Sequence, residues 1–305
     1  MEKLLQWAIN NTDQEQLRKD AEAIKRGELQ PDPSKFDPKV IEAILGKDDA
    51  TRMKEAVDCI SDPKDTVENK VIALDNLEMV GDLMQDLENM KLWPTIIAQL
   101  NNENVEVRKG VAWVCGTAVQ NNPKAQKAVC SLETQCLLDN NGLEPLLNLL
   151  SNSAEDKEVR AKAQYALSGL IKHFPEGLAQ FQEKGGFDAL ADIVKNPQDA
   201  STLRKTIFLY NTLMLEDPSV AKILVSQDIP EAFAKVLSKS IEDEDEDLAE
   251  KASHVYPTLR SAYTLVEQSS LFVPPKLASE AIRAGDKFGV DNLGLSNEEW
   301  TTLTK

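Results

Sequence analysis

Apolar and polar positions alternate along the chain in a layout that recurs in successive segments. Residues 92–123, 142–175 and 186–218 each hold a short apolar run, a polar stretch, a longer run with apolar residues three or four positions apart, and a closing proline. A spacing of three to four is the period of an amphipathic helix. The layout therefore predicts a short helix, a turn and a longer helix in each segment.

A further short amphipathic stretch follows each closing proline, where proline suits the first turn of a new helix. The dipeptides Asn141-Gly142 and Gly185-Gly186 then mark turns before the next apolar run. Each unit thus holds three helices, and weaker copies occupy residues 64–90 and 229–265. Four to five stacked units predict an all-α solenoid, because each unit buries its apolar face against its neighbours.

The two ends of the chain lie outside this array. Residues 10–39 are polar and carry three prolines, which break helices and predict a mobile tether. The tail has a helix-like stretch from Lys276 to Lys287, and its later Trp300 suggests a cap on the last repeat. We therefore divide the chain into a flexible N-terminal segment with a short amphipathic helix, a repeat domain and a helical C-terminal cap, at residues 1–40, 41–270 and 271–305.

Charge and hydropathy narrow the environment and the partners. The chain carries 34 Lys and Arg against 51 Asp and Glu, a formal net charge of −17. Such a balance disfavours binding to nucleic acid or to an anionic membrane surface. The N-terminus has no secretory apolar core, and the longest uncharged stretch, Val111–Pro123, is far too short to span a membrane. We expect a protein of the cytosol or nucleus.

The residues that usually carry chemistry are sparse and scattered. We expect no metal site and no cofactor, because only two histidines are present and the cysteines are dispersed among apolar neighbours as reduced thiols. Phosphate-binding and nucleophile motifs are absent from the sequence, and the many acids fall on predicted solvated faces. We assign no catalytic residue, so a binding protein is favoured over an enzyme. The cysteines and histidines are Cys59, Cys115, Cys130, Cys136, His173 and His254.

The repeating unit resembles the armadillo repeat, in its three helices, its opening G-[LF]-x-x-[LA] and a third helix with a pattern like YALSGL, over residues 67–265. This implies an armadillo-like right-handed α-solenoid. The stretches MEKLLQWAI, QPDP, LDNLEM, ENMKLW and GTAVQNN resemble, more narrowly, the fungal armadillo-type nucleotide-exchange factors of the cytosolic 70-kDa heat-shock chaperones. The acidic insertion IEDEDEDL and the long C-terminal tail of this chain depart from that family's pattern.

The resemblance implies a cytoplasmic co-chaperone that is not an enzyme. Such a protein binds the ATPase domain of the chaperone and hastens ADP release, so that ATP rebinds and substrate leaves. We expect a monomer, since stacking buries the apolar faces within the array. One alternative is an armadillo scaffold or transport adaptor without exchange activity, which would share every fold signal. Another alternative is an enzyme fused to the repeats, but neither terminus of the chain supplies a catalytic motif.

An arginine recurs at one site of successive third helices, as Arg108, Arg160 and Arg204. Stacking would place these side chains in a row. For Arg108 and Arg160 we favour pairing with carboxylates of the neighbouring repeat. Arg204 has no acid within four residues and lies beside Lys205, so we expect its partner to be external.

Armadillo proteins that hold basic peptides carry Trp and Asn one turn apart on the third helix. Here the asparagine is missing from all three third helices, where the pairs are Trp113 and Thr117, Tyr165 and Gly169, Leu209 and Leu213. Peptide binding of that kind therefore loses support. Trp113 and Tyr165 either line the concave face or are buried in the stack. Our candidate partner contacts are Asp82, Gln85, Glu88, Trp113, Tyr165 and Arg204.

The N-terminus carries a short apolar cluster formed by Leu4, Leu5, Trp7 and Ile9. A helix this short is marginal in water, so it should order only against an apolar surface. That surface is either the first repeat of the solenoid or the peptide-binding cleft of the chaperone. The family resemblance favours the cleft, which makes these residues a candidate substrate-release segment.

Overall fold

The computed structural model describes a chain of helices joined by short connections. Within the described residues no strand occurs, so the predicted all-α class is confirmed. The chain divides into two compact units, Met1–Glu55 and Ala56–Lys305. The described residues are 14–27, 48–79, 87, 89–120, 141–267 and 275–304.

The first unit contains α2 (Gln14–Lys25) and the beginning of α4 (Asp49–Ser61). Helix α2 falls inside the segment expected to be a tether, which is a difference from the sequence prediction. Its residues are mostly good helix formers, and the prolines that suggested a break begin only at Pro31. Exposed ion pairs one turn apart, Arg18–Glu22 and Lys19–Glu15, further favour the helix.

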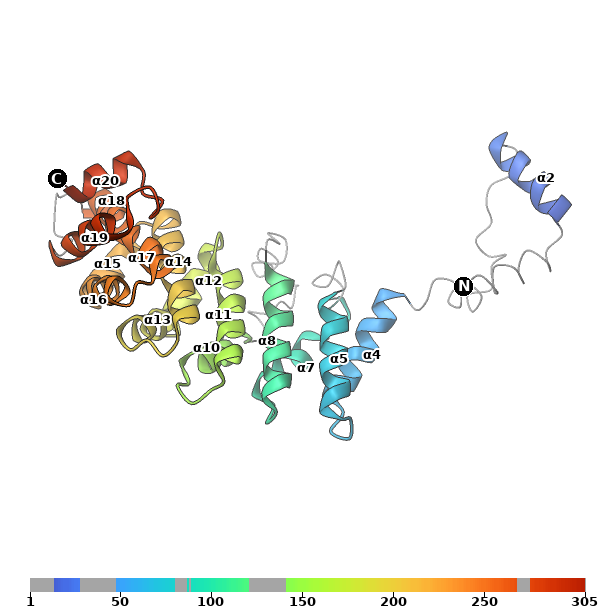
Figure 1. Ribbon diagram of the computed structural model, residues 1–305. Helices are drawn as coiled ribbons and strands as arrows, with labels where there is room; N and C mark the ends of the chain where they lie inside the picture. The colour runs from blue at the N-terminus through green and yellow to red at the C-terminus, as the bar shows by residue number, and fades with distance from the viewer. Residues whose placement is uncertain are drawn as a thin grey trace. The chain divides into compact units, whose positions relative to one another are not determined.

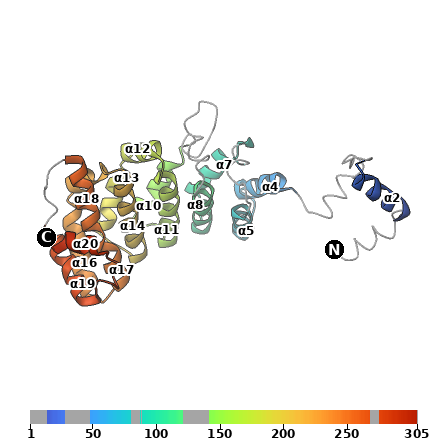
Figure 2. The same cartoon turned by 90° about the horizontal axis from the view of Figure 1, so that it is seen from above.

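The second unit repeats a pairing of one shorter and one longer helix, as the sequence predicts. Figures 1 and 2 show the longer helices following one another along one side of the stack. The longer helices are α5 (Val67–Glu78), α8 (Val105–Val119), α11 (Lys157–Ile171) and α14 (Ala200–Glu216). A shorter helix comes directly before each of α8, α11 and α14. These shorter helices are α7 (Trp93–Ala98) with the 3-10 turn η2 (Gln99–Asn101), α10 (Leu143–Ser151) and α13 (Gly186–Lys195), respectively.

Two later repeats also show the first helix of the three-helix unit. These are α12 (Pro175–Glu183) before α13 and α15 (Val220–Ser226) before α16 (Ile229–Glu242). Pro175 opens α12 at its first position, where its missing N–H costs nothing.

Each longer helix begins with the same kind of cap. The side chains of Thr66, Asn104, Asp156 and Asp199 accept hydrogen bonds from backbone N–H groups in the first turns of α5, α8, α11 and α14. Such a cap stabilises a helix by about 1 kcal/mol. The polar stretch in each repeat therefore fixes where the long helix starts.

A left-handed residue precedes the second helix of each repeat. The φ angles are 55° at Lys91, 58° at Asn141, 76° at Gly185 and 54° at Asp228, just before α7, α10, α13 and α16. Only one of the four is a glycine. The turn signals in the sequence therefore identified two of these sites, and the other two take a strained conformation because the packed helices on both sides require it.

The last repeat differs because its long helix is broken. Helix α17 (Glu246–Ser253) ends just before His254, and α18 (Val255–Glu267) follows. Pro257 explains the break, since it lacks an N–H for the Ser253 carbonyl and its ring clashes with that group.

The C-terminal helices pack on this last repeat. Helix α19 (Pro275–Phe288) contacts α16 and α17, and α20 (Asn297–Thr304) contacts α18 and α19. The ring of Trp300 lies where a Cβ at Gly285 would be 2.6 Å from it, so glycine is needed for this close approach. The helix predicted from Lys276 to Lys287 is confirmed.

Candidate protein-binding face

The large apolar side chains that remain exposed gather on one set of helices. In the described part of the second unit, every one of them lies on a long third helix or at its end, and none lies on the shorter helices. Their exposed fractions run from 36% for Val67 to 79% for Met79. We call the solvent-facing side of α5, α8, α11, α14 and α18 the long-helix face. Its exposed apolar residues are Val67, Ile72, Met79, Val105, Trp113, Phe208, Leu215 and Leu265.

The opposite sides of the same helices form the core. On α8, Val107, Val111 and Cys115 are completely buried, whereas Trp113 is 40% exposed. On α14, Ile207 and Tyr210 are completely buried, whereas Phe208 is 57% exposed. The stack therefore buries one side of α8 and of α14 and leaves apolar groups exposed on the other side. An exposed apolar patch of this kind marks an interaction surface.

Trp113 and Tyr165 meet at the centre of the long-helix face. Their ring centroids are 6.2 Å apart, and the Lys162 ammonium lies over the Trp113 ring. The Tyr165 hydroxyl donates a hydrogen bond to Gln120. A Cβ at Gly116 would fall 2.2 Å from the Tyr165 ring, so glycine there lets α8 and α11 hold the ring between them. The two aromatic residues predicted as contacts are thus brought together, and Trp113 is open to solvent.

A pocket of about 380 Å³ lies beside this aromatic pair, between α5, α8 and α11. Leu74 and Val114 supply apolar walls, and Trp113 lines one side. The rim carries both signs of charge, with Asp75 and Glu78 from α5 and lysines from α8 and α11. Its lining residues are Leu74, Asp75, Glu78, Lys109, Gly110, Trp113, Val114, Glu158 and Lys162.

The arrangement around Trp113 differs from a basic-peptide groove. A peptide cation would need the face of the indole ring, which the chain's own Lys162 occupies. The position one turn further, Thr117, also lacks the amide that would hold a peptide backbone. Both features disfavour the peptide-binding mode.

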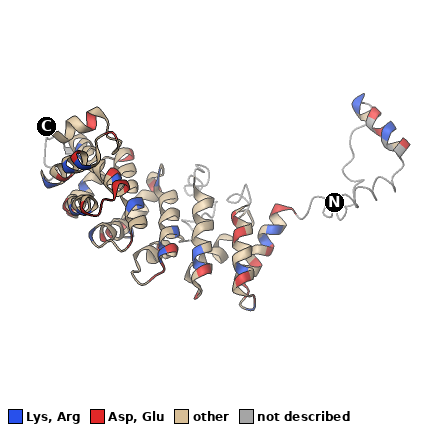
Figure 3. Cartoon of the chain, in the orientation of Figure 1, with Lys and Arg blue, Asp and Glu red and all other residues tan. Residues whose placement is uncertain are grey.

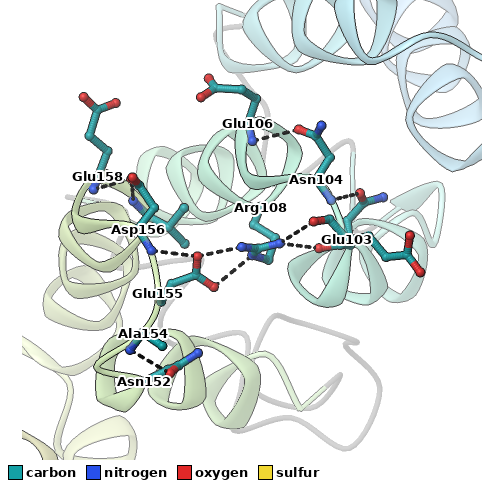
Figure 4. A network of polar contacts seen from close by, with 11 residues as sticks. Glu103, Asn104, Glu106, Arg108, Asn152, Ala154, Glu155, Asp156 and Glu158 are labelled. Carbon is teal, nitrogen blue, oxygen red and sulfur yellow. Dashed lines mark hydrogen bonds and ion pairs between the residues drawn. The ribbon is translucent and has the colours of Figure 1, made fainter.

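The recurring arginines lie near the N-terminal ends of the long helices and join successive repeats. Arg108 makes a two-pronged ion pair with Glu155 of the next repeat, with Nε to Oε2 at 2.9 Å and Nη2 to Oε1 at 2.6 Å (Figure 4). Its Nη1 donates to the carbonyls of Asn102 and Glu103 in its own repeat. Burial raises the pKa of Glu155, but hydrogen bonds from Arg108 and the Asp156 N–H leave it below its usual value. The structural interpretation of Arg108 is confirmed.

Arg160 makes the equivalent link with a different partner. Its Nη1 donates to Gln198 of the next repeat at 2.6 Å, and its Nε donates to the Leu150 carbonyl at 3.1 Å. The expected partner was a carboxylate, so the linkage is as predicted and its chemistry is not. The side chain is buried, which places it in the stack.

Arg204 corrects a prediction. The guanidinium does not lack internal partners: its Nη2 donates to both oxygens of Asp245 at 2.6 and 2.8 Å, and its Nε lies 2.6 Å from Asp247. These carboxylates lie about one repeat further along the chain, beyond the four-residue window that suggested an external partner. The reason for assigning Arg204 to a partner interface is therefore wrong.

The acidic run from Glu242 to Asp247 has a structural role that the sequence did not indicate. The sequence predicts solvated faces for the acids, but in this run α16 ends at Glu242 and α17 begins at Glu246. Asp245 caps α17 by accepting from the Leu248 N–H at 3.0 Å while it holds Arg204. Burial raises the pKa of Asp245, yet the bonds from Arg204 and Leu248 lower it overall. Figure 3 shows acidic and basic positions interspersed along the helices.

His254 has a structural role that the sequence did not indicate. Its Nδ1 lies 2.9 Å from Glu299 and its Nε2 lies 3.1 Å from the Leu293 carbonyl. The imidazole therefore joins the break between α17 and α18 to the C-terminal cap. The Arg260 guanidinium adds a bond to the Thr302 carbonyl at 2.6 Å.

The remaining predicted contacts fall outside the described residues. These are Asp82, Gln85, Glu88, Leu4, Leu5, Trp7 and Ile9. Conversely, Phe208, Leu215 and Lys162 lie on the long-helix face although they are not among the contacts predicted from the sequence. The available signal was positional, because Phe208 and Leu215 are seven residues apart and so share one side of α14.

No group of three His, Cys, Asp or Glu side chains within the described residues could hold a metal ion. Cys115 is completely buried, and burial raises the pKa of its thiol to about 12. None of the helices described is long and apolar enough to cross a membrane.

Solved structures with a similar fold are armadillo proteins. A designed armadillo repeat protein in complex with the peptide (KR)4 superposes with a TM-score of 0.58 at 15% identity, covering 83% of this chain and 96% of that protein. A β-catenin structure gives a TM-score of 0.54 at 14% identity, covering 81% of this chain and 43% of that one. The predicted armadillo-like fold is confirmed, and at such identities the likeness speaks for the fold alone.

Related sequences come from fungi. A Mycosarcoma maydis protein named Hsp70 nucleotide exchange factor FES1 is 37% identical over 72% of this chain, and this chain spans 55% of its length. The Schizosaccharomyces pombe protein of that name is 34% identical over 73% of this chain and 77% of its own length. The Saccharomyces cerevisiae one is 32% identical over 74% of each chain.

Two family descriptions match the sequence directly. The SIL1/FES1/HPBP1 C-terminal domain matches residues 84–259, which include the long-helix face from α8 to α14. The nucleotide exchange factor Fes1 family matches residues 1–90. The chain therefore belongs to the Fes1 family of nucleotide exchange factors, as the sequence predicts.

Proposed function

We propose that this protein binds the ATPase domain of a cytosolic Hsp70 chaperone through its long-helix face and accelerates release of ADP. The observation that carries the proposal is the confinement of exposed large apolar side chains to that face in the described part of the second unit. The names of the fungal relatives supply Hsp70 as the partner. The net charge of −17 disfavours nucleic acid as a competing partner.

The proposed mechanism is linkage and needs no bond chemistry in the exchange factor. If the long-helix face binds an open, nucleotide-poor conformation of the ATPase domain better than the closed one, binding shifts the domain toward the open state. Reciprocity then requires that ADP binds more weakly to the complex. The protein acts as a cytoplasmic, monomeric co-chaperone and not as an enzyme.

The proposed contacts centre on Trp113 and Tyr165, with Phe208 and Leu215 further along the face. Aromatic residues at the centre of an interface commonly supply much of its binding energy. Asp82, Gln85 and Glu88 stay predictions from the sequence. Arg204 is not among the proposed contacts, because its guanidinium is engaged by Asp245 and Asp247.

The test is a stopped-flow measurement of fluorescent ADP release from a fungal cytosolic Hsp70, with and without this protein. We expect acceleration by the wild type and at least a fivefold loss of that acceleration, at subsaturating concentration, in Phe208→Ser/Leu215→Ser. These side chains are 57% and 74% exposed, so the melting temperature should stay unchanged. Lys235→Ser, on α16 and away from the long-helix face, is the control.

Two results would contradict the proposal in different ways. No acceleration by the wild type would reject the exchange function and favour the scaffold or transport adaptor. Acceleration that survives in the double variant would retain the function but reject the long-helix face as the binding surface.

A further inference from the structure

Three lysines occupy neighbouring positions on the long-helix face. Lys109 on α8, Lys162 on α11 and Lys205 on α14 follow the recurring arginines of their helices by one or two residues. They lie close enough for mutual repulsion: burial lowers the pKa of Lys162, and the charges of Lys205 and Lys109 lower it further. A cluster of like charges on this face is notable in a chain of net charge −17.

The three ammonium groups differ in how they are neutralised. Lys109 is paired with Glu106 and with Glu158, the latter at 3.2 Å. Glu158 and Glu78 offset part of the repulsion on Lys162, but the described residues include no carboxylate within ion-pair distance of its ammonium. The same holds for Lys205, which is exposed. Two cations of this face are thus left without an acidic partner in the described part of the chain.

Lys162 is also held in a defined position. Its ammonium lies over the Trp113 ring, which Tyr165 supports at a centroid distance of 6.2 Å. A ring beneath a cation attracts it without forming an ion pair, so the charge stays available for a carboxylate approaching from solvent. Holding a long side chain in place beforehand also lowers the entropy lost on binding.

We propose that Lys162 and Lys205 form a cationic site on the long-helix face that receives carboxylates of the partner domain. The site rests on the proposed function and specifies its partner surface: an acidic patch next to apolar groups that meet Trp113 and Phe208. Such a patch relieves the repulsion among the lysines on binding. Besides any contact of its own with the partner, Trp113 positions Lys162, because its ring holds the ammonium in place.

The test compares two double variants that lose the same net charge from different surfaces. Lys162→Gln/Lys205→Gln removes the site, whereas Lys195→Gln/Lys235→Gln removes two exposed lysines carried by α13 and α16, outside the long-helix face. The affinity for the isolated Hsp70 ATPase domain is measured by calorimetry at 50, 150 and 300 mM salt. Circular dichroism and melting temperature confirm that each variant is folded.

We expect the site variant to bind about tenfold more weakly at the lowest salt and to show a flatter dependence of affinity on salt. The control variant should stay within twofold of the wild type at each salt concentration. Trp113→Phe should give an intermediate loss, because a phenylalanine ring attracts a cation less strongly.

Two results would overturn the site while leaving the proposed function intact. In one, the wild type accelerates ADP release and Lys162→Gln/Lys205→Gln binds with unchanged affinity and an unchanged salt slope. In the other, both double variants lose affinity equally, so that only the overall charge matters. A wild type that neither binds the domain nor releases ADP would instead reject the proposed function itself.

Discussion

Replacing Arg108 with methionine tests whether the arginine links hold the repeats together. Arg108 and Glu155 are 15% and 6% exposed, and they meet through two bonds of 2.9 and 2.6 Å. Methionine keeps most of the apolar stem but leaves the Glu155 carboxylate without its cation. Two backbone carbonyls, of Asn102 and Glu103, also lose a donor.

The expected cost follows from the burial of the pair. Removing one partner of a buried ion pair costs about 3–5 kcal/mol, because the other charge stays behind in a poor solvent. An exposed pair contributes only about 0–1 kcal/mol. For a folded unit of this size, each kcal/mol shifts the melting temperature by about 2–4 °C, so Arg108→Met should lower it by roughly 6–20 °C.

Two further variants isolate the cause. Lys287→Met removes an equivalent link between elements, to Glu244 at 2.8 Å, but there the side chains are 45% and 73% exposed. It should change little. Arg108→Met/Glu155→Leu removes both charges and should recover much of the lost stability, since no carboxylate is left unpaired.

Urea denaturation, followed by circular dichroism at 222 nm, gives the free energy of unfolding of the wild type and the three variants. A loss in Arg108→Met no larger than in Lys287→Met would refute the reasoning, because burial would then not determine the cost. Failure of the double variant to recover stability would place the effect in the two carbonyl bonds and not in the ion pair.

Two other outcomes are expected. Asp245→Asn keeps the cap on α17 and loses the charge that holds Arg204. Because the pKa of Asp245 is lowered in the folded state, its contribution to stability is present above the unfolded value of about 3.9 and is lost as the pH falls through the folded pKa. The difference in urea midpoint between wild type and variant should therefore shrink from pH 7 to pH 3. A gap that does not change with pH would contradict this. Deletion of residues 1–30 should leave the melting temperature and ADP release nearly unchanged but slow the release of a bound polypeptide from the chaperone; a clear loss of thermal stability would instead identify Leu4, Leu5, Trp7 and Ile9 as a structural cap.

The local parts of the fold could be predicted because their signals are local. The period of the apolar residues locates α8, α11 and α14, and the polar stretch before each supplies the cap at Asn104, Asp156 and Asp199. The strained residues Lys91 and Asp228 could not be predicted, because neither is a residue type that favours a left-handed turn as strongly as glycine does. Their conformation is imposed by helices that pack on either side.

The partners of Arg108, Arg160 and Arg204 could be predicted only by assuming how successive repeats align when they stack. Arg204 lies 41 residues before Asp245, a separation that becomes a contact only when one repeat is stacked on the next. The sequence placed both residues in repeats but gave no means to align them side by side. The residues close to Arg204 in the sequence therefore could not indicate its carboxylate partner.

The residues of the long-helix face likewise could be predicted only in part. Trp113 and Tyr165 were identified because armadillo proteins carry functional residues at those positions. Phe208 and Leu215 look like core residues in the sequence, and only the packing of α14 shows that they are 57% and 74% exposed. The position of Lys162 over Trp113 depends on the spacing of α8 and α11, which no pattern within one helix contains.

The arginine links and the long-helix face belong to the same helices, and this connects stability to the proposed mechanism. Each of α8, α11 and α14 is fixed at its N-terminal end, by a cap and by an arginine bonded to the next repeat. The exposed groups of the face, such as Trp113 and Phe208, lie one turn further along the same helices. In the proposed mechanism, a partner domain that opens on binding exerts an opposing force on these side chains. Because the helices beneath them are locked in register, the binding free energy is available to open the partner and is not lost in deforming the solenoid.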